Sequence, residues 1–197
     1  DDLLQTKGGA ALPSNAPGYQ PQLFFSRGGH RFRQAPAVTL PVFTESAGAA
    51  VAADFNGDGR LDVFVGGRVV PGRYGMVPRS AIWINQGGTF VDQSTEMAPL
   101  LAHAGMVSGA LATDVDRDGW PDLLLALQWG EIMCWHNRQG KGFDDWTERL
   151  GFARAGSGWW NSIAAADFNG DGRLDYVAGN LGLNTPYHAT PEAPAML

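Results

Sequence analysis

One nine-residue acidic segment occurs three times in this chain, and it constrains the fold more than any other feature. The copies read DFNGDGRLD, DVDRDGWPD and DFNGDGRLD. They align without gaps and begin at Asp54, Asp114 and Asp167, so they lie 60 and 53 residues apart. Self-similarity at a nearly constant spacing indicates a repeat architecture, in which each repeat is one supersecondary unit that packs on the next. The sequence therefore predicts a fold of equivalent units.

Short apolar stretches flank every copy of the acidic segment. In the first copy they cover residues 48–53 and 63–65, and the other copies have similar stretches at residues 108–113, 123–127, 161–166 and 176–178. These stretches are too short for helices and are bounded by glycine, so they predict buried strands. Each acidic segment is thus expected to be the loop between two strands.

A second repeated pattern follows the same spacing. An aromatic strand, a turn that contains glycine and a returning strand led by Phe occur at residues 23–32, 82–90 and 134–143. Glycine supplies the positive φ of a tight turn, so each segment predicts a β-hairpin. One repeat is then four short antiparallel strands, which is typical of a β-propeller blade. We expect an all-β fold with about three blades in this chain.

The order of these hairpins predicts how the chain is organised. Residues 1–20 are expected to be an irregular N-terminal lead-in, residues 21–185 the blades, and residues 186–197 a C-terminal tail or the start of the next blade. The repeats begin with an outer hairpin and end after an inner one, so two whole blades lie between two half blades. A ring needs about four to eight blades. Either the chain is a fragment, or a homo-oligomer completes the propeller.

Each acidic loop has the ligand pattern of a calcium site. Oxygen-bearing side chains occupy positions one, three, five and nine, and glycine occupies position six. Ca²⁺ takes about six to eight oxygen ligands, whereas softer metals prefer other donors. The sequence predicts three Ca²⁺ sites, each with four side chains and the backbone carbonyl of position seven. The predicted ligands are Asp54, Asn56, Asp58, Arg60 and Asp62; Asp114, Asp116, Asp118, Trp120 and Asp122; and Asp167, Asn169, Asp171, Arg173 and Asp175.

Two other interpretations of the loops are weaker. An EF-hand needs a Glu at position twelve and flanking helices, but that position holds Val65, Leu125 and Ala178. The loops also resemble ordinary hairpin turns, yet all three copies keep every ligand position. They hold ten of the 20 acidic residues, and three Ca²⁺ ions would cancel the net charge of −6. A structural role for the ion is expected, because binding to the native state stabilises it.

With these motifs, the sequence resembles the FG-GAP/VCBS repeat family of integrin-α-type propellers over about residues 23–185. The segments 158–162 and 179–184 also resemble connections in large bacterial VCBS-repeat proteins. The resemblance implies a secreted, periplasmic or cell-surface protein that takes part in cell adhesion or in the recognition of a protein or glycan ligand.

Several functions are disfavoured by what the sequence lacks. The acidic balance and the absence of a basic cluster disfavour nucleic-acid binding. The apolar runs are far shorter than the roughly 20 residues of a membrane-spanning helix. No catalytic constellation is visible, so an enzyme is not expected. Two alternatives stay open: a polysaccharide-active lyase or hydrolase using His103, Tyr74 or His188, and an assembly subunit that closes a ring or filament through its terminal half blades.

Single aromatic, histidine and cysteine residues favour packing over chemistry. Trp83 and Trp135 occupy matching hairpin strands and are expected in the core. Trp159 and Trp160 are expected in the core or at a rim, with a sugar-stacking platform as the alternative. Cys134 is expected to be a buried apolar residue rather than a nucleophile. The four histidines, His30, His103, His136 and His188, show no metal-binding spacing.

Overall fold

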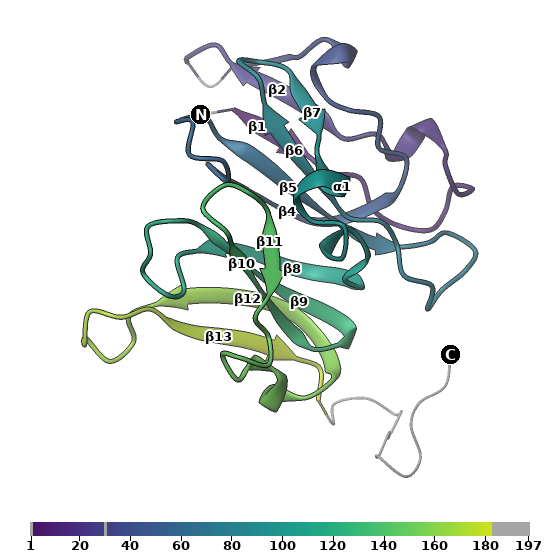
Figure 1. Ribbon diagram of the computed structural model, residues 1–197. Coiled ribbons are helices and arrows are strands. Elements are labelled where there is room, and N and C mark those ends of the chain that lie inside the picture. Colours follow the sequence, from purple (N-terminus) through teal and green to yellow (C-terminus); the bar gives the residue numbers. More distant parts are fainter. Residues whose placement is uncertain (1, 30, 183–197) are drawn as a thin grey trace.

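The computed structural model describes residues 2–29 and 31–182, which form a succession of antiparallel sheets (Figure 1). The predicted C-terminal segment 186–197 lies outside the described residues. The strands are β1 (Leu3–Gln5), β2 (Gln22–Ser26), β3 (Phe32–Gln34), β4 (Ser46–Ala53), β5 (Asp62–Val69), β6 (Ala81–Asn85), β7 (Phe90–Asp92), β8 (Met106–Thr113), β9 (Asp122–Gly130), β10 (Ile132–Asn137), β11 (Phe143–Asp145), β12 (Gly158–Ala166) and β13 (Asp175–Asn180).

Two complete four-stranded units form the centre of the molecule. Strands β4, β5, β6 and β7 pair in chain order, and so do β8, β9, β10 and β11. All of these pairings are antiparallel, as the two repeated sequence patterns predict. The strands β12 and β13 form a further hairpin, and the start of β12 also pairs with the end of β9. Strand β8 packs between β4 and β12.

Helical structure is limited to short turns. The elements are α1 (Ser94–Met97) and the 3₁₀ turns η1 (Pro17–Tyr19), η2 (Ala37–Thr39), η3 (Leu101–His103) and η4 (Phe152–Ala155). Within the described residues, no helix combines the length and the apolar character needed to cross a bilayer.

The N-terminal segment contains a strand that the sequence analysis does not predict. Strand β1 pairs with β2 in the register that β5 uses toward β6: Leu3 lies opposite Phe24, as Val63 lies opposite Trp83. A strand of three residues is too short to show a periodic pattern. The expected irregular lead-in of residues 1–20 therefore includes the second strand of a blade-like sheet.

The residue before β1 completes this equivalence. The carboxylate of Asp2 accepts an N–H bond from Ser26 at 2.8 Å, and the carboxylate of Asp62 accepts one from Asn85 at the same distance. Asp62 is the ninth residue of the first acidic loop. Asp2 thus takes the place of a ninth loop residue in the N-terminal sheet.

Alternate side chains of β5 pack into two different interfaces between sheets. Val63 and Val65 join a core cluster with Trp83 and Phe43, on the side of the N-terminal sheet. Phe64 faces the other way, into the cluster that it shares with other residues of the two complete units. These include Leu123, Leu125, Leu127 and Trp135. Trp83 and Trp135 are 0% and 3% exposed, so the prediction that they are core residues is confirmed.

Candidate metal centres

Each acidic loop connects the first two strands of a unit: β4 to β5, β8 to β9, and β12 to β13. In the first loop, the carboxylate of Asp54 accepts N–H bonds from Gly57 (2.8 Å), Asp58 (3.0 Å) and Gly59 (2.7 Å). The first Asp of the other loops accepts equivalent bonds, Asp114 from Asp118 and Gly119, and Asp167 from Gly170, Asp171 and Gly172. The three loops therefore share one backbone conformation.

Glycine at position six is required by this conformation. Gly59, Gly119 and Gly172 have φ angles of 81°, 92° and 79°. These angles lie in the left-handed region that a Cβ atom disfavours. The turn brings the side chains of positions one, three and five to the same side of the loop, as the predicted ligand pattern needs.

The ninth residue of the first two loops is a buried carboxylate. Asp62 and Asp122 are 0% and 1% exposed. Asp62 accepts N–H bonds from Phe55 (3.0 Å) and Asn85 (2.8 Å), and Asp122 accepts the matching pair from Val115 and Asn137. Burial raises the pKa of both carboxyl groups, although these N–H bonds oppose the shift. A cation beside them would favour their ionised forms.

Two asparagines hold the loops from the neighbouring hairpin. The side-chain amide of Asn85 donates to the carbonyl of Leu61 at 3.1 Å, and that of Asn137 donates to the carbonyl of Pro121 at the same distance. Sequence analysis missed this role, although both asparagines end the aromatic strand of the repeated hairpin. The repetition of an amide at that place was the available signal.

The third loop has fewer supports within the described part of the chain. Asp175 accepts an N–H bond from Phe168 at 3.0 Å, and it is only partly buried. No described hairpin follows β13, so Asp175 has no counterpart of the Asn85 or Asn137 amide among residues 2–29 and 31–182. The loop nevertheless keeps the hydrogen bonds of Asp167 that define its turn.

The donor chemistry of the second loop fits a divalent cation. Carboxylate oxygens of Asp114, Asp116 and Asp118 all lie within 4.8 Å of one another. Carboxylates at this spacing repel each other unless a cation compensates their charge. The other two loops have the amide oxygens of Asn56 and Asn169 in place of the middle carboxylate. All three loops thus supply the hard oxygen donors that Ca²⁺ prefers.

Hydrogen bonds favour the ionised forms of two loop carboxylates. A hydrogen bond from the Asn56 side chain lowers the pKa of Asp58, and the Gly172 amide lowers the pKa of Asp167. The guanidinium of Arg60 also pairs with Asp58 at 2.6 Å. Arg60, Trp120 and Arg173 lie at position seven of their loops, where their carbonyls stay predicted ligands.

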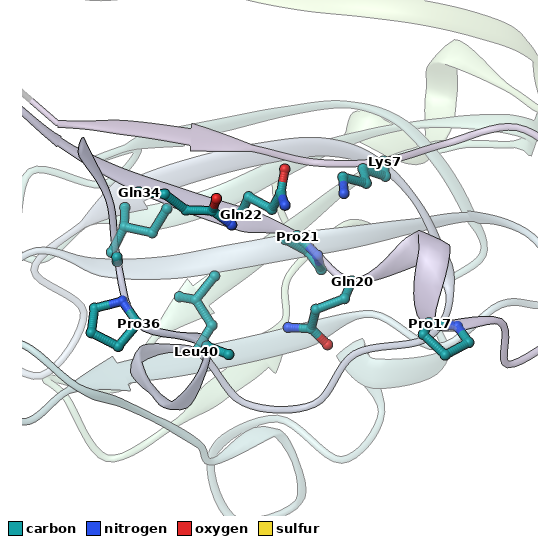
Figure 2. Close-up of a pocket in the computed structure, with 11 residues that line it drawn as sticks. Lys7, Pro17, Gln20, Pro21, Gln22, Gln34, Pro36 and Leu40 are labelled. Carbon is teal, nitrogen blue, oxygen red and sulfur yellow. The ribbon is translucent and has the colours of Figure 1, made fainter. Parts of the chain in front are cut away.

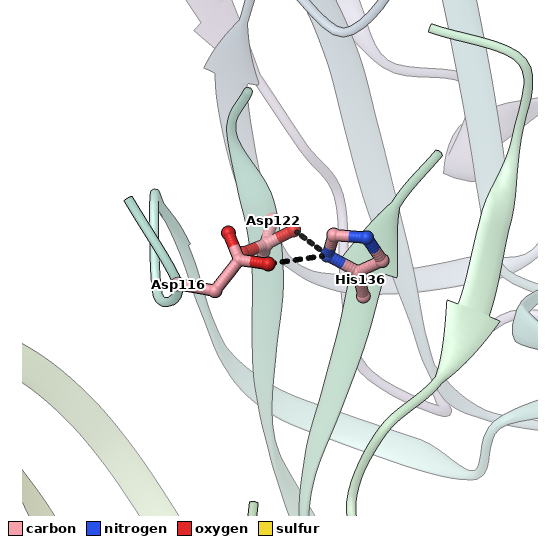
Figure 3. A group of neighbouring side chains, drawn as sticks. All are labelled: Asp116, Asp122 and His136. Atoms are coloured by element: carbon pink, nitrogen blue, oxygen red, sulfur yellow. Dashed lines mark ion pairs between the residues drawn. The ribbon is translucent and has the colours of Figure 1, made fainter. Parts of the chain in front are cut away.

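His136 lies beside the second loop, which the sequence analysis did not predict. Its Nδ1 atom is 3.2 Å from Oδ1 of Asp122 and 3.6 Å from Oδ2 of Asp116 (Figure 3). The three ligand atoms lie within 4.8 Å of one another. The strand register of β9 and β10 brings them together across 20 residues of sequence, so no local spacing signals the cluster.

The start of the first loop packs against the next unit, whereas the second and third loops border a cleft. Phe55 is fully buried and packs edge-on against Phe143, with ring centroids 5.6 Å apart. A cleft of about 490 Å³ lies between the second and third loops, and its lining includes Asp114, Asp116 and Tyr176.

A second pocket is separate from the acidic loops. It has a volume of about 160 Å³ and lies at the N-terminal sheet, where Pro17, Gln20 and Leu40 line it with Lys7 (Figure 2). Its lining contains no carboxylate and no imidazole. It offers neither a metal site nor an acid–base pair.

An aromatic cluster lies at the strand ends opposite the acidic loops. The rings of Trp129 and Trp159 are 5.0 Å apart between centroids, and the indole N–H of Trp129 donates to the Tyr74 hydroxyl at 2.8 Å. Trp129 has a φ of 60°, which is strained for a residue with a side chain. Tyr74 also contacts Gln128.

Two residues named for an enzymatic alternative, Tyr74 and His103, share no hydrogen bond in the described part of the chain. Tyr74 belongs to the aromatic cluster, and His103 lies exposed at the end of η3. His188 lies outside the described residues.

These features define a class of protein. Four-stranded antiparallel units, each with an acidic loop between its first two strands, form an all-β repeat protein of the propeller type. The family model described as FG-GAP-like repeat matches residues 10–65 and 114–178, which is more than half of the chain. The chain belongs to this family. A comparison with curated proteins gives no match.

Proposed function

We propose that this chain is a calcium-stabilised β-propeller module that recognises a protein or glycan ligand outside the cytoplasm. The observation that carries the calcium role is the common geometry of the three loops. Each first Asp accepts N–H bonds from its own turn, which leaves the loop oxygens gathered on one side. Calcium is then a structural ion, because the loops lie between strands and join no catalytic group.

The charges explain why such an ion would stabilise the fold. Each loop concentrates acidic side chains, and Asp62 and Asp122 are buried. Binding to the native state alone stabilises a protein by about 2.7 kcal/mol per site when free metal exceeds its dissociation constant a hundredfold. We expect the midpoint of thermal unfolding to rise with calcium and to fall with a chelator.

Calorimetric titration with Ca²⁺ and thermal unfolding with and without EDTA test this role. An Asp54→Ala variant should lose one site, while a Glu96→Ala variant, at an exposed residue of α1, should bind as the wild type does. The proposal fails if Ca²⁺ gives no heat and leaves the unfolding midpoint unchanged.

The aromatic cluster supports recognition of a protein or glycan ligand, and for a glycan it offers rings on which a sugar can stack. Tyr and Trp combine an apolar ring with a polar group, which suits contact surfaces. Tyr74 is 49% exposed, and its hydroxyl ties it to Trp129. The indole ring of Trp129, whose backbone is strained, lies beside the ring of Trp159.

Binding to a panel of immobilised glycans tests this part of the proposal. Tyr74→Ala and Trp159→Ala should each weaken binding, whereas Phe32→Ala, at an exposed residue of β3, should not. Equal binding by all three variants would assign recognition to another surface. The same panel, assayed for new reducing ends or unsaturated products, tests the enzymatic alternative.

A further inference from the structure

We propose that His136 makes the second acidic loop a mixed nitrogen–oxygen site for a divalent transition metal of the Zn²⁺ or Co²⁺ kind, with Asp116 and Asp122 as the other ligands. The inference rests on the proposed metal-binding role of the loops. It adds a metal preference that the other two loops do not share.

The spacing of the three ligand atoms fits a small ion. Zinc lies about 2.0–2.2 Å from nitrogen and carboxylate ligands, so ligand atoms around one such ion are about 3.0–3.6 Å apart. Nδ1 of His136 lies 3.2 Å from the Asp122 oxygen and 3.6 Å from the Asp116 oxygen. The side chains converge on one point in Figure 3. An ion can occupy that point without a large rearrangement.

The nearest charged groups to the Nδ1 atom of His136 are the carboxylates of Asp116 and Asp122. Nδ1 is inaccessible to solvent and makes no hydrogen bond, although the whole side chain is 12% exposed. Its two neighbours are carboxylates, which only accept hydrogen bonds. A lone pair on Nδ1 would face their negative charge, so the arrangement calls for a proton or a metal ion between the three groups. Imidazole is a ligand for transition metals, whereas Ca²⁺ takes oxygen.

Comparison with the first loop shows that two residue changes coincide here. The strand position of His136 is held by Ile84 in the first complete unit, where the side chain is 6% exposed and packs in the core. Position three is Asp116 in this loop, but it is Asn56 in the first. The second loop thus gains a nitrogen donor and a carboxylate together.

Neighbouring rings fix the orientation of the imidazole. His136 stacks on Trp146 with centroids 3.6 Å apart and an interplanar angle of 14°. The guanidinium carbon of Arg149 lies 3.7 Å from the centroid of the same Trp146 ring. A stacked ring keeps its nitrogen pointed at the carboxylates, and such preorganisation lowers the cost of metal binding.

Titration of the metal-free, tag-free chain with Co²⁺ tests the inference, because the visible absorption of Co²⁺ reports its ligands. We expect one Co²⁺ per chain with a nitrogen-ligand spectrum. His136→Leu should weaken this binding at least about tenfold, since even the loss of an outer partner costs about that much. His103→Gln, at an exposed histidine, is the matched control.

Asp116→Asn provides a second variant if His136→Leu does not fold. It introduces the residue of the other two loops and should weaken Co²⁺ binding while Ca²⁺ stabilisation persists. A Co²⁺ titration that is unchanged in both variants, beside normal Ca²⁺ stabilisation, would overturn this inference alone. If the chain binds neither Co²⁺ nor Ca²⁺, the proposed function is overturned as well.

Discussion

At the scale of single residues, burial separates carboxylates that look alike in the sequence. Asp62 and Asp175 hold the same loop position, but Asp62 is fully buried and Asp175 is partly exposed. The turn of the acidic loop could be predicted because its residues lie within nine consecutive positions, while the metal ligands in it stay a prediction. The place of His136 could not, because it depends on the pairing of β9 with β10.

Asp92 gives a prediction for the pH dependence of stability. Burial alone would raise the pKa of Asp92, but hydrogen bonds from Ser94 and Arg79 outweigh it and hold the pKa below the usual 3.8. The ionised form therefore stabilises the fold above pH 3.8, and this stabilisation is lost as the pH falls through the lowered value. Asp92→Asn should cost about 1 kcal/mol at pH 7, because the partly exposed pair is screened by solvent.

Urea unfolding from pH 7 to pH 2 measures this effect. The difference between the wild type and Asp92→Asn should shrink as the pH falls, whereas Asp144→Asn, at an exposed residue of β11, should stay close to the wild type. A constant difference at every pH would contradict the assignment.

Cys134 should be unreactive in the folded protein. Its side chain lies in β10 at 1% exposure, and burial raises its pKa to about 12. The thiolate is the reactive form, so little of it is present at neutral pH. We expect a thiol reagent to modify Cys134 only after unfolding in denaturant. Mass spectrometry measures the rate of modification. Rapid modification of the native chain would show that β10 opens and would contradict this expectation.

At the scale of the elements, a repeated turn closes the outer hairpin of both complete units. The Ser94 hydroxyl accepts the N–H of Ile82 at 2.9 Å, and the Thr147 hydroxyl accepts the N–H of Cys134 at 3.0 Å. Each hydroxyl residue follows an Asp by two positions, and that Asp accepts its N–H bond. This motif was visible in the sequence as Asp-x-Ser and Asp-x-Thr, but two short copies do not identify a structural role.

Removal of either hydroxyl should destabilise the fold. Ser94→Ala and Thr147→Val each leave a buried N–H without its acceptor, which costs about 1–3 kcal/mol. Thr95→Ala, at an exposed residue of α1, is the control and should change stability by less than about 0.5 kcal/mol. Chemical unfolding of the three variants measures the differences, and equal values would mean that water replaces the lost acceptors.

The four-stranded unit itself was predictable, because the acidic loop and the aromatic hairpin both recur with the same spacing. Strand β1 was not, since its partner β2 lies beyond an intervening segment with no repeat. The pairing of β12 with both β13 and β9 was also beyond a local pattern. Local motifs thus define the hairpins, and contacts distant in sequence define how they join.

At the scale of the whole molecule, β1 bears on the assembly alternative. Completion of one half blade by another would pair β13 of one copy with β2 of a second copy. Strand β1 already pairs with that edge of β2. Assembly by this route therefore requires β1 to leave its sheet.

The contribution of an acidic loop to stability should depend on whether another described unit follows it in the chain. Phe55 and Phe168 both hold position two of their loops, but they are 0% and 64% exposed. Phe55→Ala should cost about 3–5 kcal/mol because it leaves a cavity against Phe143. Phe168→Ala should cost less than about 1 kcal/mol. Thermal unfolding of the two variants measures the contrast, and similar losses would show that Phe168 is covered in solution.

The burial of Phe55 shows that a unit depends on the unit that follows it in the chain. The Phe143 ring packs against Phe55, and the side-chain amide of Asn137 donates to the Phe55 carbonyl; both groups come from the unit that follows the first loop in the chain. If the protein is shortened from its carboxyl end, the acidic loop of the last remaining unit loses the contacts that the next unit would make with it. A trimmed version would thus expose the Phe55 ring and leave the Phe55 carbonyl without its donor, and its solubility would depend on which repeat came last.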